Sequence, residues 1–396
     1  MKFLHTSDWH LGKLFHEKSL IEDQEYVLNQ IISTALQAKK QNSPYAALIV
    51  SGDIYDRSMP PSEAGIIFNR FLVKITSELP DLHIFINSGN HDSASRLSFA
   101  AEFLEQHNIH IVTNTKNITT PVVVCQGQEK IAFYQLPFLT PLSIPSEDEE
   151  KPNRTQQELY TAACSLIMES HKKNYGDMPS VINAHLYAKG CSLGASERTN
   201  VGTVEQVDSA IFKDFSYGAF GHIHKFQPCD KLKKCYYSGS LLAYNFDDSP
   251  KTGMLEVEIT KENPLPKVKQ IEFTPLHPIA KVRAKMADLI GSKADSILIS
   301  QNQNNYIQAI LTDEVMPTET FATLKNVFPN LLSVIMESES SSSTKTSASI
   351  EMRKKAIDSN DPEKIFDQFM SDIEEDGESE VVQKEKQIFT EEARKL

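Results

Sequence analysis

Five short polar blocks, each following a short apolar run, most constrain what this 396-residue chain can fold into. In chain order they are Asp8-Trp9-His10, Gly52-Asp53, Gly89-Asn90-His91-Asp92, Asn183-Ala184-His185 and Gly221-His222-Ile223-His224. Short apolar runs bounded by Gly, Ser and Asn are typical of buried strands. Polar residues that follow such strands lie at their carboxyl ends, where layered α/β domains bind ligands. The blocks therefore predict one site, assembled from residues far apart in the sequence.

Segments with helical period lie between the first predicted strands. They span residues 20–40, 62–79 and 95–107. Strands that alternate with helices predict a layered α/β domain.

The residue types of the blocks indicate a pair of divalent metal ions. Asp, Asn and neutral His are better suited to bind Mn, Fe or Zn than Ca²⁺, which prefers a cage of oxygen ligands only. Paired metals lie about 3.5–4 Å apart, generate a hydroxide near neutral pH and hold both oxygens of a displacement at phosphorus. A lone His or Gly-Asp is usually structural, but coincidence does not explain five ordered blocks. The other seven histidines match no block, and we interpret them as structural: His5, His16, His83, His107, His110, His171 and His277.

The ordered pattern D-x-H, G-D-x-x-D-R, G-N-H-D, H and G-H-x-H resembles the calcineurin-like metallophosphoesterase superfamily. Longer strings are similar to the SbcD family of double-strand-break-repair nucleases: residues 5–13, 196–198, 201–207, 221–225 and 237–240. The resemblance covers about the first 275 residues and continues more weakly to the end.

The resemblance implies a role for each block residue. Asp8, His10 and His224 would hold one metal, and Asn90, His185 and His222 would hold the other, with Asp53 as the bridge. His91 would be the acid–base residue beside the leaving oxygen, and Asp56 matches the position that orients this histidine in related phosphatases. Arg57 could touch phosphate, although a surface loop arginine is the simpler interpretation.

The resemblance also implies a function. By this resemblance the chain would be a DNA nuclease that acts in repair and recombination. It would act as a 3′→5′ double-strand exonuclease and as a single-strand or hairpin endonuclease. Its cofactors would be two divalent ions, with Mn²⁺ favoured and Mg²⁺, Fe²⁺ or Zn²⁺ as alternatives. Its partners would be a second copy of the chain and an SbcC-type ATPase, giving a heterotetramer. No G-x-x-x-x-G-K-[ST] motif occurs in the sequence, so ATP dependence would come from that partner.

Two other functions stay open at this point. One is a stand-alone phosphatase or small-molecule phosphodiesterase on the same two-metal scaffold. The other is a scaffold that has lost catalysis, which is the weakest alternative because every ligand position is filled.

Composition limits where and how the chain works. The net charge is −13, but residues 357–396 alone hold thirteen acidic and five basic residues. No run of basic residues offers a strong binding surface for DNA phosphates, which favours a nuclease that binds DNA mainly through its partner. No apolar stretch approaches the ~18 residues of a membrane span. The five cysteines contain no C-x-x-C, which predicts reduced thiols in the cytoplasm. Cys229 and Cys235 are spaced poorly for zinc.

The pattern changes along the chain predict four parts. Residues 1–274 would form the nuclease domain and 275–337 a small α+β capping domain, with strands at 279–284, 306–311 and 331–336 and helices at 286–290 and 318–328. The Ser-rich stretch 338–347 is typical of a flexible linker.

Residues 348–396 would form a helical tail that binds a partner. After Asp361-Pro362-Glu363, a strong helix start, an apolar stripe follows at helical spacing: Ile365, Phe366, Phe369, Met370 and Ile373. A second amphipathic segment spans residues 381–389. The resemblance implies the ATPase partner's coiled-coil base as the surface it binds, and folding back onto the capping domain is the alternative.

Overall fold

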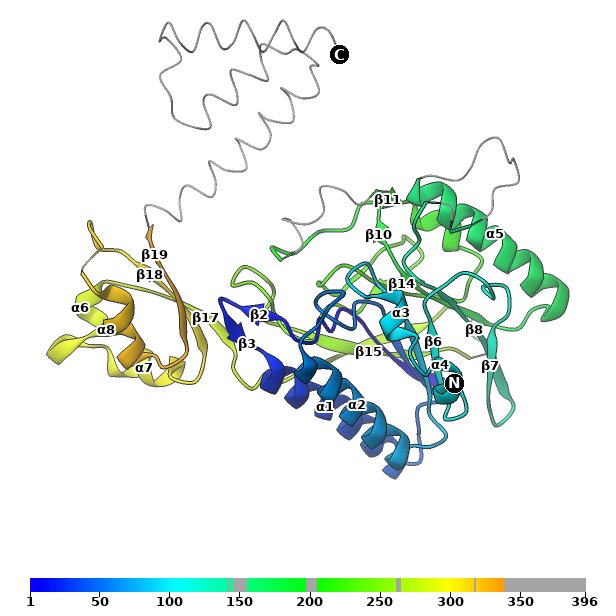
Figure 1. Ribbon diagram of the computed structural model, residues 1–396, viewed down its shortest axis with the longest axis horizontal. Helices are drawn as coiled ribbons and strands as arrows, with labels where there is room; N and C mark the ends of the chain where they lie inside the picture. The colour runs from blue at the N-terminus through cyan, green and yellow to red at the C-terminus, as the bar shows by residue number, and fades with distance from the viewer. Residues whose placement is uncertain (142, 145–154, 197–204, 261–264, 317, 338–396) are drawn as a thin grey trace, which may run out of the picture. The chain divides into compact units, whose positions relative to one another are not determined.

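The chain divides into two compact units in the computed structural model, which describes residues 1–337 except 142, 145–154, 197–204, 261–264 and 317 (Figure 1). The larger unit contains Met1–Ala280 and Asn304–Tyr306, and the smaller contains Lys281–Gln303 and the described residues from Ile307 onward. The predicted linker 338–347 and tail 348–396 lie outside the described residues.

Two six-stranded sheets form the centre of the larger unit. The first has the order β16 (Lys267–Glu272), β15 (Gly253–Glu258), β1 (Lys2–Thr6), β4 (Ala47–Ser51), β5 (His83–Asn87) and β6 (Ile109–Val112). The second has the order β13 (Gln227–Pro228), β14 (Cys235–Tyr237), β12 (Tyr217–Gly221), β9 (Ser180–His185), β8 (Glu129–Leu136) and β7 (Val122–Gln126). Two short pairs complete it: β2 (Leu14–Phe15) with β3 (Lys18–Ser19), and β10 (Tyr187–Ala188) with β11 (Gln206–Val207).

The sheets face each other across an apolar core, and helices cover their outer faces (Figure 1). Phe3 and Phe85 of the first sheet meet Phe133 of the second, with ring centroids 5.6 and 4.7 Å from that of Phe133. Helices α1 (Ile21–Lys40) and α2 (Ser62–Glu78) lie side by side on the first sheet, and α5 (Gln156–Asn174) packs on the second through a shared cluster of buried residues. This four-layer arrangement confirms the predicted α/β layered fold.

Parallel pairing brings the five blocks to one edge of the sandwich. Strands β1, β4 and β5 are parallel neighbours in the first sheet, and β9 and β12 are parallel neighbours in the second. Three blocks follow the carboxyl ends of β1, β4 and β5, whereas the fourth forms the last three residues of β9 and the fifth begins with the last residue of β12. Strand β4 also contacts β9 and β12 across the core. The blocks therefore meet although up to 216 residues separate them along the chain.

The third predicted helix, residues 95–107, is wrong as a continuous element. Two short helices replace it, α3 (Ala94–Leu97) and α4 (Ala101–Glu105), and Ala100 between them has a left-handed backbone (φ 59°). Of the apolar residues in this segment, Leu97 is buried but Phe99 and Phe103 are exposed. A helix of this length depends on burying a stripe, and this one buries too little to continue.

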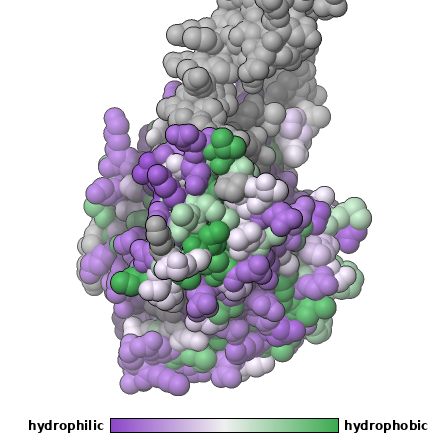
Figure 2. Space-filling model, turned by 90° about the vertical axis from the view of Figure 1, so that its left-hand side faces the viewer, coloured by the Kyte–Doolittle hydropathy of each residue, from purple (hydrophilic) through white to green (hydrophobic). Residues whose placement is uncertain are grey.

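The smaller unit is built on a three-stranded sheet in the order β17 (Ile279–Ala284), β18 (Tyr306–Leu311) and β19 (Leu331–Met336), as the pattern predicted. Helices α6 (Met286–Leu289) and α8 (Thr320–Val327) are also confirmed, whereas η3 (Gly291–Lys293) and α7 (Ser296–Asn302) were not predicted. Figure 2 shows one face of the molecule, on which hydrophobic side chains are interspersed among hydrophilic ones. Of the described helices in either unit, none has the length and apolar character needed to cross a membrane.

Candidate metal centre

Strained backbone positions carry several predicted ligands. Asp8, His10 and Asp53 have φ of 52°, 44° and 51°, and His222 has 103°. Non-glycine residues rarely adopt positive φ, and such conformations concentrate at functional sites. Glycines allow the blocks to approach: a Cβ on Gly89 would collide with Asp53, and a Cβ on Gly221 with the Ser51 carbonyl.

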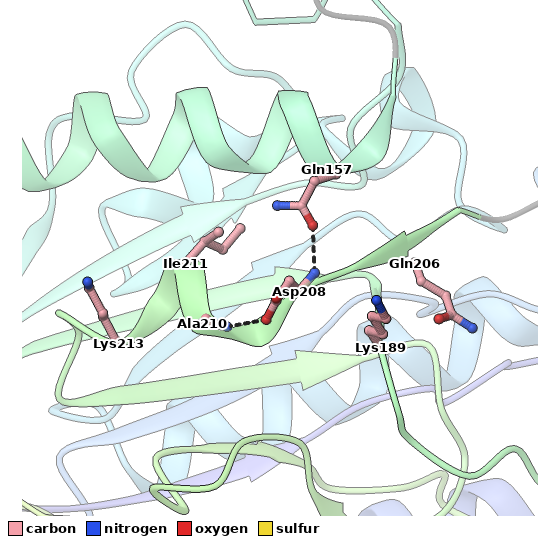
Figure 3. A pocket seen from close by; sticks show the side chains of 7 residues that line it. All are labelled: Gln157, Lys189, Gln206, Asp208, Ala210, Ile211 and Lys213. Atoms are coloured by element: carbon pink, nitrogen blue, oxygen red, sulfur yellow. Dashed lines mark hydrogen bonds between the residues drawn. The ribbon is translucent and has the colours of Figure 1, made fainter.

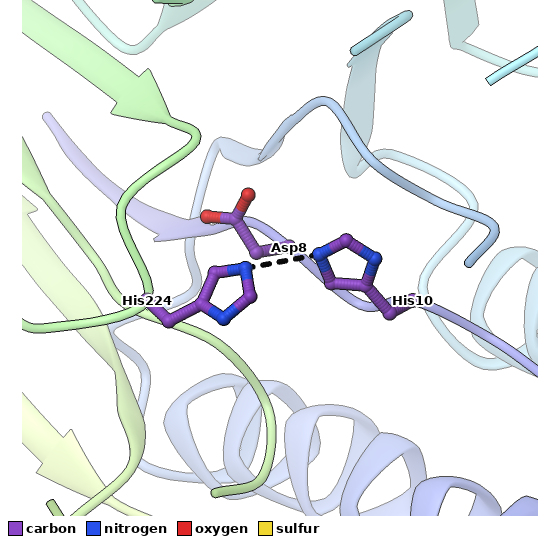
Figure 4. A group of neighbouring side chains, drawn as sticks. All are labelled: Asp8, His10 and His224. Atoms are coloured by element: carbon purple, nitrogen blue, oxygen red, sulfur yellow. Dashed lines mark hydrogen bonds between the residues drawn. The ribbon is translucent and has the colours of Figure 1, made fainter. Parts of the chain in front are cut away.

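The first predicted ligand set converges on one point. Asp8 and His10 follow β1, His224 follows β12, and their donor atoms lie within 4.8 Å of one another. The Nε2 atoms of His10 and His224 are 3.0 Å apart (Figure 4). A backbone hydrogen bond ties the two segments together, because His222 N donates to Asp8 Oδ1 at 2.9 Å.

The second predicted set converges in the same way. Asn90 Oδ1 lies 3.0 Å from His185 Nε2 and 3.1 Å from His222 Nδ1. The other nitrogen of His185, Nδ1, donates to the Ser51 carbonyl at 2.8 Å, so Nε2 is the nitrogen that faces the site. Three blocks from both sheets thus present one amide oxygen and two imidazole nitrogens to a common point.

Asp53 lies between the two sets. Its Oδ2 is 3.7 Å from His10 Nε2 and 3.3 Å from His185 Nε2, one residue from each set. Its Oδ1 accepts the backbone N–H of His91 at 2.9 Å. Asp53 therefore lies where the predicted bridging carboxylate would lie.

His91 lies next to the first set, and its donor atom lies within 4.8 Å of those of His10 and Asp53. Its ring centroid is 4.9 Å from that of His10, and its Nδ1 contacts the backbone carbonyl of Asp56 at 2.8 Å. The Asp56 carboxylate instead pairs with Lys13 at 2.6 Å. Asp56 therefore contacts His91 through the main chain, and Arg57 is exposed in the same loop.

Supporting residues that the motifs did not single out surround the site. Ser7 Oγ donates to Asp8 Oδ2 at 2.5 Å and contacts Ser238 Oγ at 2.8 Å. Asp92 accepts the N–H groups of Ile54, Tyr55 and Gly89, which joins the second block to the third. Asp92 belongs to the third block, but the sequence alone does not distinguish a carboxylate that accepts backbone hydrogen bonds from one that binds a metal.

Electrostatics favour a cation here. Burial lowers the pKa of His222 and of His224 to about 3 and that of His10 well below its usual value, so these imidazoles are neutral. Burial raises the pKa of Asp8 to about 7. Burial alone would raise the pKa of Asp53 and lower that of His185, but their mutual attraction holds Asp53 well below its usual pKa and raises that of His185 to about 9.

The donor set fits divalent metal. Among the described residues, buried Asp8 and Asp53 form no ion pair with Lys or Arg, and neutral imidazoles are the form that binds metals. Two bound cations would compensate both carboxylates and supply Lewis acidity and a hydroxide at neutral pH. The chain's own residues would orient the ligands, bridge the cations and, through His91, handle a proton.

Two hollows in the larger unit differ in their relation to this centre. One of about 390 Å³ adjoins the first set and is lined by His224, Lys225, Ser240 and Asp248 among others. The other, about 610 Å³, shares no residue with the centre. There Asp208 N donates to Gln157 Oε1 at 2.7 Å and Ala210 N donates to Asp208 Oδ1 at 2.9 Å, so its polar groups serve local structure (Figure 3).

Comparison with known proteins agrees with this chemistry. Residues 1–226 match the calcineurin-like phosphoesterase family, and the chain belongs to that family. A relative from Staphylococcus epidermidis, described as the D subunit of the nuclease SbcCD, is 30% identical over 336 residues, which is 84% of this chain and 85% of the relative.

Proposed function

We propose that the chain is an SbcD-type nuclease component, a two-metal phosphodiesterase that cleaves DNA as a 3′→5′ exonuclease and a single-strand or hairpin endonuclease. The observation that carries the proposal is the Asp53 carboxylate within 3.7 Å of one imidazole from each convergent ligand set. Asp8, His10 and His224 would hold one cation, Asn90, His185 and His222 the other, with Mn²⁺ the favoured metal. The nearly full-length similarity to a component of a nuclease supports DNA as the substrate.

The chemistry assigned to each residue follows from its position. Asp53 would hold both cations, and the imidazoles of His222 and His224 would remain neutral because burial lowers their pKa. His91, aligned by the Asp56 carbonyl, would give a proton to the leaving oxygen. Lys225, which lines the hollow beside His224, offers a positive charge to a phosphodiester entering there.

A labelled duplex separates this function from the alternatives. With Mn²⁺, the purified chain should shorten a 3′-recessed or blunt labelled duplex and open a hairpin, with and without an SbcC-type ATPase. Bis-(p-nitrophenyl) phosphate alone would not decide, because a small-molecule phosphodiesterase also hydrolyses it. If the chain hydrolyses small esters but leaves the duplex uncut, the result would favour the stand-alone phosphatase or small-molecule phosphodiesterase. If it hydrolyses neither substrate, the result would favour a scaffold that has lost catalysis.

Self-association through the surface around α2, Phe99 and α4 is part of the proposal. Ile66, Phe99 and Phe103 are 53, 81 and 61% exposed there, while Ile67, Phe68 and Phe71 of the same region are buried in the core. Large apolar side chains gathered on a surface mark interaction sites. A second copy of this chain is the proposed occupant, by analogy with the dimer contacts of the family.

Charge on this surface should give monomers. The variant Phe99→Glu with Phe103→Glu buries two charges at the contact, so light scattering should report one chain where the wild type reports two. Leu166→Glu, a 41% exposed leucine on α5, is the matched control and should stay dimeric. A wild type that is monomeric at high micromolar concentration would sink the idea.

Removal of residues 348–396 should separate catalysis from ATP dependence. The tail lies outside the described residues, and its apolar stripe is inferred from the sequence. An isolated short helix is marginal in water, whereas a stripe laid into a groove is a common recognition mode. The truncated chain should keep metal-dependent cleavage but lose binding to the SbcC-type ATPase and ATP-stimulated cleavage of duplex ends.

Point variants sharpen this test. Phe366→Ser with Phe369→Ser should reproduce the loss of partner binding in a pull-down. Asp367→Asn with Glu374→Gln, on the opposite face, should not. Wild-type partner affinity in the truncated chain would show that docking lies elsewhere.

A further inference from the structure

Four of the five cysteines gather in one region of the larger unit. Cys164, Cys229 and Cys235 are buried in one hydrophobic cluster, and Cys191 packs against it. The fifth, Cys125, is exposed on β7. Among the described residues, the groups compact enough to hold a cation include no cysteine, so a metal site does not explain the gathering.

Hydrogen bonds hold the chain around Cys191 against the strand that leads to Cys229. Ser192 N donates to Gln227 Oε1 at 2.9 Å, and Gln227 Nε2 donates to the Ser192 carbonyl at 2.8 Å. Gln227 begins β13, two residues before Cys229, and Cys229 N donates to the Cys235 carbonyl at 2.9 Å. Cys191 and Cys229 are thus fixed beside each other by groups other than their thiols.

The two thiols differ in chemical character. Hydrogen bonding from Cys229 lowers the pKa of Cys191, which is partly exposed. Burial, followed by the contact with Cys191, raises the pKa of Cys229 well above its usual value. Reactive cysteines have thiolate character and solvent access, and redox-sensing ones have a second cysteine nearby. Cys191 is the reactive member and Cys229 the resolving one.

We propose that Cys191 and Cys229 form a peroxide-sensitive thiol pair that closes reversibly into a disulfide. The Cys191 thiolate attacks hydrogen peroxide, so an S–O bond forms, the O–O bond breaks and one water leaves after proton uptake. The Cys229 sulfur then attacks the sulfenic sulfur, forming the S–S bond and breaking the S–O bond. The Cys229 proton leaves with the second water, so two thiols are oxidised and one peroxide is reduced to two waters.

The pair is connected to the candidate metal centre. Five residues after Cys191, Ser196 Oγ contacts Nδ1 of the predicted ligand His224 at 2.9 Å. The N–H groups of Ala195 and Ser196 donate to Asp248 Oδ1 at 2.9 and 3.1 Å. A disulfide brings sulfurs to about 2.05 Å, closer than any non-bonded contact, so closure draws the segment before Ser196 toward β13.

A shift of this segment should lower activity. Partners that orient metal ligands typically contribute 10–100-fold to metal affinity or activity, so we expect a loss of about tenfold on oxidation. This effect on activity rests on the proposed phosphodiesterase function, whereas formation of the disulfide does not.

Peptide mapping tests the thiol pair directly. The full-length protein is reduced, treated with hydrogen peroxide, quenched with catalase, alkylated with N-ethylmaleimide and digested without reductant. Mass spectrometry should find the Cys191 and Cys229 peptides linked and lighter by two hydrogens, and dithiothreitol should separate them. No linked peptide, or one joining Cys229 to Cys235 instead, would overturn the proposal.

Activity in Mn²⁺, assayed after peroxide removal, tests the connection to the metal centre. Wild type and Cys125→Ser should lose activity and recover it with dithiothreitol, and Cys191→Ser should keep it. Cys191→Ala serves if the serine variant does not fold. Equal loss in the Cys191 variants would refute the switch, as would a disulfide that leaves activity unchanged. If the protein hydrolyses nothing under any condition, the proposed function fails while the peptide map still decides the thiol pair.

Discussion

Asp53→Asn should empty both metal positions and abolish hydrolysis. Asp53 lies within 3.7 Å of one predicted ligand of each set, so an amide there removes a charge and one cation-binding oxygen at both positions. The carboxylate is buried and its pKa is held well below the usual value, so it is charged throughout the working pH range. Elemental analysis after dialysis against Mn²⁺ should give two metals per wild-type chain and close to none in the variant.

A matched control separates this loss from a general effect of the substitution. Asp214→Asn makes the same chemical change at an exposed position and should keep two metals and full activity. Circular dichroism should report the same fold for all three proteins. Retention of two metals at wild-type affinity by Asp53→Asn would refute the bridging role.

His91→Ala should keep both metals and lose most cleavage. Its ring lies beside the first set, but its Nδ1 is engaged by the Asp56 carbonyl, which leaves one nitrogen for proton transfer. General acid–base catalysis contributes about 10²–10⁴-fold, and we expect a fall in kcat of that size. Elemental analysis and a duplex cleavage assay on the same preparation measure the two outcomes.

Leaving-group dependence makes this test specific. A good leaving group such as p-nitrophenolate needs little protonation, so the variant should lose far less activity on bis-(p-nitrophenyl) phosphate than on DNA. His107→Ala, on an exposed histidine outside the blocks, should match the wild type. Loss of metal from His91→Ala would make His91 a ligand instead.

Asp56→Asn refines the picture of how His91 is oriented. The structure places the Asp56 carbonyl, not its carboxylate, against His91 Nδ1. Main-chain contacts survive side-chain substitution, so the effect of Asp56→Asn should arise from the lost pairing with Lys13 and the altered contact with His10 Nδ1, 3.6 Å away, rather than from misalignment of His91.

The sequence predicted the parts of the fold in which one strand and one block go together. The sequence predicted five strands because each is a short apolar run with a polar block at its carboxyl end: β1, β4, β5, β9 and β12. Strands β7 and β8 and helix α5 escaped, because no block marks them. The break in the helix was missed because an alanine such as Ala100 gives no sign in the sequence of a left-handed backbone.

The sequence predicted which residues form the candidate site, but not which residues hold them in place. The types and order of the ligands can be read from the sequence. The hydrogen-bond contact between Ser196 and His224, in contrast, joins a loop to a segment 28 residues away. Such contacts depend on tertiary packing, which residue spacing does not encode. The same holds for the gathered cysteines, which come from helix, turn and strand.

The left-handed backbone at Asp8, His10 and Asp53 has a consequence for engineering this chain. Each such residue raises the free energy of the fold by roughly 1–3 kcal/mol. Glycine or asparagine adopts this backbone more readily, so a screen for heat resistance alone would favour them at these positions. The variants selected would melt at higher temperature and would no longer bind metal. Thermal selection of this protein therefore has to be coupled to selection for catalysis.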